Sequence, residues 1–449
     1  MSKSMRHFRI ELYEEHLAEG SFLREQRTAL IGDESIAWPD LRPFEQRLDA
    51  HLDALVAGGD LALQTCIAAT GGSDPHELFC AIGVICRAHR VDLLAAALAR
   101  FDWNDLGKVE ALRAALEREL PRQWSGFVES ALASENEVLV QVISQVCGSR
   151  RIFAVPALRA ALVSCPGAVT QILRALGRLG AADALVDMKA RSIDERPEIR
   201  AAALEALLLL GHPEVIPVCH FEANSQPWAR RLLGLGGSRA SNEVLMRIAQ
   251  TGQVDAECLL AMGLLGDLRC LPTLHACLQE ASLRAIAALA MHWITGAMLF
   301  GEVFRAEEVK EEELFDGERR RWLSSGEPPR RADGQPYGTA ANQLSTDPDL
   351  WKEWLGENVD RFNPSTRYRK GRPFAFEAIL SDLQNPATDR RLRSLEALEL
   401  PIRMGCGFAA EVDAYVGQQI VALSSVDKPS ALKHSANPEN GWQVVGLRH

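Results

Sequence analysis

Tyrosine is scarce in this sequence, with 4 in 449 residues, and runs of β-branched residues are few. A fold built mainly from strands is usually rich in both, so their shortage argues against an all-β protein. Alanine, leucine, glutamate and arginine dominate instead, and all four favour the helix. The composition therefore predicts an all-α protein.

Paired cysteine motifs are missing as well. The ten cysteines are spread singly, without a CxxC pair or the dense spacing of a disulfide framework. Several stand on apolar helix faces, as Cys258 does beside Ala261 and Met262. This spacing argues against zinc ribbons and disulfide-stapled folds. We expect small buried thiols in a reducing compartment, which favours a cytoplasmic location.

No apolar run is long enough to favour a membrane span. The longest run, residues 285–301, includes His292 and falls short of the ~20 apolar residues that a span needs. Residues 1–22 are charged and lack the apolar core of a signal peptide. We therefore expect no membrane insertion, and a buried helix in residues 285–301.

The net charge of −11 argues against some classes of partner. Residues 349–449 are neutral overall, so the negative charge lies in residues 1–348. A net acidic chain repels phosphate groups, and we expect neither general nucleic-acid binding nor attraction to an anionic membrane.

Sequence motifs of common catalytic sites are not found. There is no HExxH, no GxSxG, no phosphate-binding loop with its lysine and no EF-hand. Repeat hydroxylases that hold two irons need several His-Glu pairs, whereas His76-Glu77 is the single such dipeptide. Cys219-His220 has no further ligands at metal spacing. We predict no catalytic residues, no metal and no cofactor.

What the sequence does contain is a glycine-marked block that recurs about every thirty residues. Aligning Gly148, Gly180, Gly211, Gly237 and Gly266 gives steps of 32, 31, 26 and 29 residues. Within one block, apolar residues recur at helical spacing, proline stands in the first turn and glycine ends the helix. A fixed period of this length predicts helix pairs stacked into a solenoid.

The distribution of these patterns divides the chain into five regions. We expect an N-terminal helical cap in residues 1–74 and the repeats in residues 75–301. An acidic run, a basic run and a stretch rich in glycine and proline predict a charged linker or long loop in residues 302–348. A C-terminal helical unit in residues 349–424 and a polar tail in residues 425–449 complete the prediction.

Basic and aromatic side chains gather in residues 361–372, beside two tryptophans. Interface hot spots favour arginine together with aromatic side chains. We predict a partner-binding surface patch here; the alternative is a solvated loop whose arginines pair with the acids of the linker. The candidate residues are Trp351, Trp354, Arg361, Arg367, Tyr368, Arg369, Lys370 and Arg372.

The helix pairs resemble the HEAT-like repeat superfamily over about residues 75–300. A closer resemblance involves three segments: residues 47–55, the Ile-Thr-Gly ending at residues 294–296, and the block from Trp351 to Pro373. Together these segments are similar to a proteobacterial HEAT-repeat family that has no assigned biochemical activity. Its members are often encoded beside type VI secretion spike and effector genes.

The resemblance implies a cytoplasmic accessory protein of secretion, such as an adaptor or chaperone that loads a type VI effector or spike. The repeats favour the same class, because a solenoid offers extended surface for a protein partner. We therefore predict a HEAT-like solenoid that acts as a non-enzymatic interaction scaffold. An immunity-type or regulatory binding protein, and an enzyme with a metal site between repeats, are the alternatives.

Overall fold

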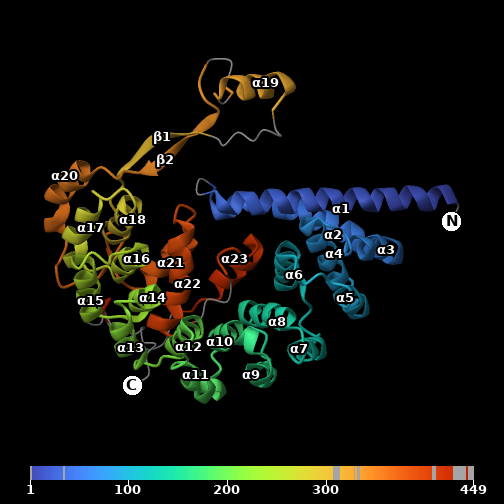
Figure 1. The fold of residues 1–449 in the computed structure, drawn as a ribbon, viewed down its shortest axis with the longest axis horizontal. Coiled ribbons are helices and arrows are strands. Elements are labelled where there is room, and N and C mark those ends of the chain that lie inside the picture. Colours follow the sequence, from blue (N-terminus) through green and yellow to red (C-terminus); the bar gives the residue numbers. More distant parts are fainter. Residues whose placement is uncertain are drawn as a thin grey trace.

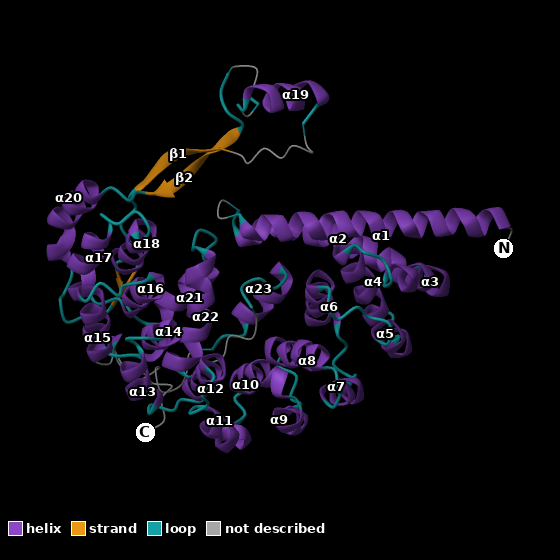
Figure 2. Ribbon diagram, viewed as in Figure 1, coloured by secondary structure: helices purple, strands orange, loops and turns teal. Residues whose placement is uncertain are grey.

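The computed structural model describes residues 3–33, 36–306, 314–327, 329–330, 334–406, 411–427 and 441–442. Within these ranges the chain is mostly helical, as the composition predicts, and strands form two short antiparallel pairs (Figure 2). No single described helix is long and apolar enough to cross a membrane, although two bent helix pairs reach that length and apolarity together.

Two layers of helices make up the middle of the chain and follow an arc (Figure 1). Each inner helix packs against the next inner helix, and from α7 onwards each outer helix packs against the inner helix that follows it. The inner helices are α4 (Pro75–Arg87), α6 (Leu106–Glu119), α8 (Glu137–Arg150), α10 (Val169–Arg178), α12 (Pro197–Leu209), α14 (Pro227–Gly236), α16 (Ala256–Leu265) and α18 (Arg284–Thr295). The outer helices are α5 (Val91–Leu98), α7 (Ser125–Leu132), α9 (Val155–Ser164), α11 (Leu185–Arg191), α13 (Val215–Glu222), α15 (Arg239–Gln250) and α17 (Leu271–Cys277).

Glycines inside the inner helices let neighbouring backbones approach closely. A Cβ atom added to Gly263 in α16 would lie 2.8 Å from the Cα atom of Ala290 in α18. A Cβ atom at Gly177 in α10 would lie 2.6 Å from the Cα atom of Ala206 in α12. Real Cβ atoms do not approach other atoms so closely, so the spacing of these inner helices depends on glycine.

A second set of glycines ends the inner helices. Gly180, Gly211, Gly266 and Gly296 adopt the left-handed conformation, with φ angles of 65°, 81°, 67° and 68°. Glycine is favoured at this position because a side chain would strain the backbone. The aligned glycines of the sequence are not all of one kind, because Gly148 lies inside α8, where Arg151 is the left-handed residue after the helix, and Gly237 ends α14 with an extended backbone.

The N-terminal residues form three helices at one end of the arc. They are α1 (Lys3–Gly32), α2 (Arg42–Ala57) and α3 (Gly59–Ala69). α1 packs against α2, α3 and α4, whereas its first turns are exposed and extend to the right in Figure 1, by the N-terminal label. The apolar residues of α2 that face the core, such as Leu48, Leu52 and Leu55, are those whose helical spacing the sequence shows.

The C-terminal helices lie on the concave side of the arc (Figure 1). After α20 (Pro348–Asn358) they are α21 (Phe376–Gln384), α22 (Arg390–Met404) and α23 (Val416–Ser424). α22 packs against the inner helices α12 and α14, and α23 packs against α2. The chain therefore covers part of its own concave face and returns to its N-terminal helices.

Tyr415 contacts residues of the N-terminal half and so links the C-terminal helices to it. Its ring lies between the guanidinium groups of Arg118 and Arg27, whose carbon atoms are 3.5 and 4.0 Å from the ring centroid. Glu45 accepts hydrogen bonds from Arg27 at 2.7 Å and from the backbone N–H of Val416, in the first turn of α23, at 2.8 Å. Cation–π contacts and a carboxylate at a helix N-terminus both stabilise this junction.

Residues 302–348 do not form the predicted linker. β1 (Phe300–Ala306) and β2 (Gly338–Leu344) pair as an antiparallel ribbon, and α19 (Asp316–Ser325) lies beyond its far end (Figure 2). We call β1, β2 and α19 the arm. The prediction failed because the acidic and glycine-rich stretches between the strands dominate the composition of the region. Residues 307–313 of the acidic run, and most of the predicted polar tail, lie outside the described residues.

The glycine contacts predict that Gly263→Ala destabilises the protein by about 1–3 kcal/mol, because the new methyl group overpacks the contact between α16 and α18. Urea unfolding measures the change. Gly126→Ala in α7 is the matched control, since nothing lies within 4 Å of a Cβ atom there. That variant should gain up to about 1 kcal/mol from helix propensity. Equal effects of the two substitutions would contradict the packing argument.

Candidate interaction site

The predicted binding segment lies at the C-terminal ends of two inner helices. Tyr368–Arg369 (β3) and Arg372–Pro373 (β4) form a short hairpin. The backbone N–H of Tyr368 donates to the carbonyl oxygen of Gly266, just after α16, at 2.9 Å. The N–H groups of Lys370 and Gly371 donate to carbonyls in the last turn of α18, at 2.7 and 2.9 Å. The segment therefore caps helices of its own chain.

Most of the predicted binding residues are not on the surface. Arg367, Arg369 and Trp351 are fully buried, with 0 % of their surface exposed, and Tyr368 is also buried. Trp354 and Lys370 are partly buried, whereas Arg361 is exposed and the side chain of Arg372 is 44 % exposed. The prediction of an exposed basic patch is thus wrong for the centre of the segment. Arg367 and Arg369 have partners inside the protein that the composition of the segment does not reveal.

Three buried arginines bind the last carbonyl groups of α14 and α16. Arg367 donates to the carbonyl oxygens of Leu265 and Leu264, both at 2.7 Å. Arg369 donates to the oxygen of Leu264 at 2.8 Å. Arg403 of α22 donates to carbonyls at residues 234 and 237, at 3.2 and 3.0 Å. These carbonyls have no intrahelical partner and carry the negative end of the helix dipole, so guanidinium groups suit them.

Glu399 holds the three arginines together. Its carboxylate pairs with Arg367, with Arg403 at 2.8 Å and with Arg369 at 2.9 Å. Burial alone would raise the pKa of Glu399, but the charges of the three arginines outweigh burial and hold that pKa below its ordinary value. Glu396 accepts a bond from Arg369 at 2.8 Å, and burial raises its pKa well above the ordinary value. We call these five side chains the arginine clamp.

Glu399→Gln should destabilise the protein by about 3 kcal/mol or more, because it leaves buried arginines without their shared counter-charge. Thermal and urea unfolding measure the loss. Since the folded pKa is lowered, the carboxylate contributes at neutral pH, and its contribution disappears as the pH falls through the folded value. Glu353→Gln, on the exposed side of α20, is the control and should change stability by less than about 0.5 kcal/mol.

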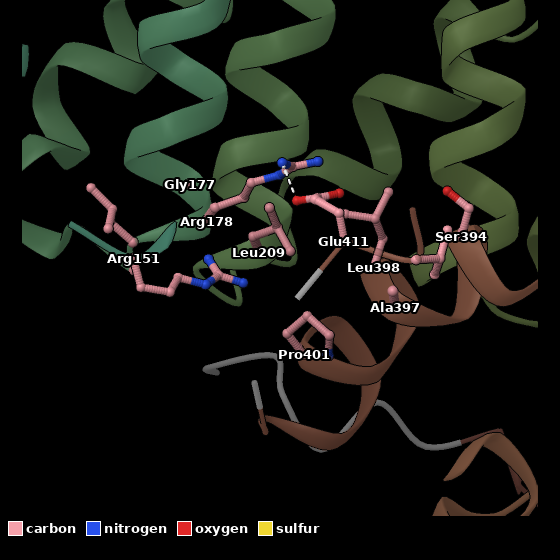
Figure 3. Close-up of a pocket in the computed structure, with 12 residues that line it drawn as sticks. Arg151, Gly177, Arg178, Leu209, Ser394, Ala397, Leu398, Pro401 and Glu411 are labelled. Carbon is pink, nitrogen blue, oxygen red and sulfur yellow. Dashed lines mark hydrogen bonds and ion pairs between the residues drawn. The ribbon is translucent and has the colours of Figure 1, made fainter. Parts of the chain in front are cut away.

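A cavity of about 270 Å³ lies beside the clamp, between α22 and the ends of α10 and α12 (Figure 3). Leu209 and Pro401 line it, and Arg178 pairs there with Glu411. Burial, and then the charge of Arg178, lower the pKa of Arg151 on the same wall. Both arginines stand at helix C-termini, whose dipoles already attract cations. With Glu411 also present, the cavity has little surplus positive charge for an anion.

The described residues offer few groups for catalysis. Nine of the ten cysteines are buried, as the sequence predicts, and Cys406 is partly buried. Burial raises the pKa of Cys66, Cys80 and Cys258 to about 12, so these thiols stay protonated and poorly nucleophilic at neutral pH. Across the described ranges, no three His, Cys, Asp or Glu side chains are placed to hold a metal ion.

Exposed apolar side chains form a row on the outer layer. Val163 near the end of α9, Ile193 just after α11 and Phe221 near the end of α13 are 83 %, 82 % and 83 % exposed. Their spacings of 30 and 28 residues match the period of the helix pairs. Val163 and Phe221 lie one residue before the ends of their helices, and Ile193 lies two residues after the end of α11, so the three are close to the same end of successive outer helices. We call these three side chains the outer row. Their spacing can be read from the sequence, whereas their exposure cannot.

Comparisons with known proteins identify neither a family nor a function for this chain. A scan against protein-family models finds no match to the chain, and a search of curated proteins finds no significantly similar sequence. The resemblance to a HEAT-repeat family and the association with type VI secretion therefore stay predictions.

Proposed function

We propose that this protein is a non-enzymatic scaffold, with its helix pairs arranged as a HEAT-like solenoid, and that it binds another protein along the outer row. The single observation that supports this function is the recurrence of highly exposed apolar side chains at the period of the helix pairs. Isolated exposed apolar residues are common on protein surfaces and need no explanation. Three of them near the same end of successive outer helices are a recurring feature, which favours an interaction site.

The dimensions of the outer row favour a protein partner. Packed helices lie about 8–10 Å apart, so three successive outer helices set the row's length at about 20 Å. An amphipathic helix of four turns covers that length, because each turn advances about 5.4 Å. A small molecule would need a concave pocket, whereas the row lies on convex helices.

The position of the C-terminal helices also favours the outer layer. Helical-repeat arrays commonly bind partners on the concave surface. Here α22 packs on α12 and α14 and is held there by Arg403 of the arginine clamp, while α23 packs on α2. A partner would have to displace buried ion pairs to reach the covered helices, whereas the outer row is open.

The partner's identity is proposed from the sequence resemblance alone. We propose an effector or spike protein of a type VI secretion apparatus, with this protein as its cytoplasmic adaptor or chaperone. The outer row supports binding of a protein but does not identify which protein.

A triple variant tests the function. Val163→Ser, Ile193→Ser and Phe221→Ser together should weaken a stoichiometric complex at least tenfold, because they remove the apolar side chains that a partner would bury. Affinity capture from the native organism identifies the partner, and titration of the purified pair measures the affinity. The melting temperature should stay unchanged, since all three side chains are exposed.

The control removes similar apolar side chains elsewhere. Leu106→Ser, Phe153→Ser and Val186→Ser replace residues that are almost as exposed and lie outside the row. This control should bind like the wild type. Equal binding by the outer-row variant would exclude the row as the interface, and a loss with both variants would indicate a general effect of surface hydrophobicity.

A further inference from the structure

The ribbon of the arm has no core of its own. All seven residues of β1 are exposed, and the described chain contacts the ribbon only near its base, where the Phe300 and His292 ring centroids lie 5.5 Å apart. Phe304 is 52 % exposed and Val303, on the opposite face, is 39 % exposed. A two-stranded ribbon is at best marginally stable in water, and three or more strands with an apolar face are usually needed. The arm thus lacks the further strands that such ribbons require.

The hydrogen-bond pattern shows which backbone groups of β2 point outward. The N–H of Ser345 donates to the carbonyl oxygen of Leu299 at 2.7 Å, in line with the register of the ribbon. Bonded and non-bonded pairs alternate along antiparallel strands, so Ala341 faces β1 through its backbone. The N–H and C=O groups of Ala340 and Asn342 therefore point to the open edge.

The open edge of β2 lacks the usual protection against strand pairing. Natural edge strands carry charged side chains or proline that prevent pairing with another chain. β1 has Glu302 and Arg305, whereas β2, from Gly338 to Leu344, has no charge and no proline. Within the described ranges, no backbone hydrogen bond from outside the ribbon reaches Ala340 or Asn342. The edge of β2 can therefore accept another strand.

We propose that β2 pairs with β2 of a second copy of this chain, antiparallel about a twofold axis, to form a four-stranded sheet. Pairing centred on Ala341 places Ala340 opposite Asn342 of the partner subunit. The outward N–H of each residue can then donate to the outward C=O of the other. Because β2 is uncharged, the pairing brings no like charges together, and the small alanine side chain allows close approach at the axis.

The second copy also enlarges the face of the ribbon that carries its aromatic side chains. Phe300 and Phe304 share this face with Leu344, and the pair Glu302–Asn342 lies between them, because residues alternate between faces. Pairing through β2 joins this face to its copy and gives the sheet four strands. The arm and the outer row are separate surfaces, so self-association through β2 does not rest on the proposed function.

Asn342→Pro tests the pairing. Proline removes an N–H at the open edge while every bond between β1 and β2 remains. Sedimentation of the full-length wild type at micromolar concentration should show a dimer, and the variant should raise the dimer dissociation constant at least tenfold. Glu302→Pro is the matched control, because Glu302 lies directly opposite Asn342 and its N–H points to the other edge. The control should dimerise like the wild type.

A cysteine cross-link gives a second test that does not depend on proline. In Ala341→Cys the two new thiols meet at the axis, where Cα atoms of a non-bonded pair lie about 4.5 Å apart, within disulfide range. Mild oxidation should yield a covalent dimer on a non-reducing gel. Val303→Cys, opposite Ala341 on β1, should yield little. A wild type that stays monomeric, or a dimer that Asn342→Pro leaves intact, would overturn the proposal.

Discussion

The bonds between buried guanidinium groups and the carbonyl ends of α14 and α16 determine how the two main parts of this protein fit together. The last carbonyls of a helix need partners from elsewhere, and here the C-terminal region supplies them. Burying three arginines is costly unless their bonds and counter-charges are all in place. Glu399 provides the charge that the three arginines share, and Glu396 accepts a further bond from Arg369, so the C-terminal helices dock on the arc in one well-defined position.

Docking of the C-terminal helices on the arc limits which surfaces of the protein remain open to a partner. Because α22 and α23 occupy the concave side, the chain's own residues already bury the inner-helix surface beneath them. The large exposed apolar side chains and the open strand edge lie elsewhere, near the C-terminal ends of α9, α11 and α13 and on the arm. Stability and the proposed recognition thus involve different surfaces. A change to the outer row or to β2 leaves the arginine clamp untouched, so binding at these surfaces can be altered without unfolding the protein.

The sequence predicts the parts of this fold that depend on local pattern. The helix pairs follow from a thirty-residue period with apolar stripes, and residues such as Leu207 are buried as that pattern requires. The arginine clamp could not be predicted, because the main partners of Arg369 include a backbone carbonyl 105 residues away, and backbone carbonyls leave no mark in a sequence. The ribbon escaped prediction for a related reason, since Phe300 pairs with Leu344 across a long charged insertion.

Two departures from the usual distribution of polar and apolar groups have different explanations. Charge is buried at Arg367 and Arg369, and helix ends within the same chain account for it. Large apolar side chains are exposed at Val163, Ile193 and Phe221, and no described element of the chain covers them. Local rules are broken mainly where function or a compensating contact requires it, and the second departure is the observation on which the proposed partner rests. A partner is therefore expected to bind the outer layer and not the basic segment of residues 361–372.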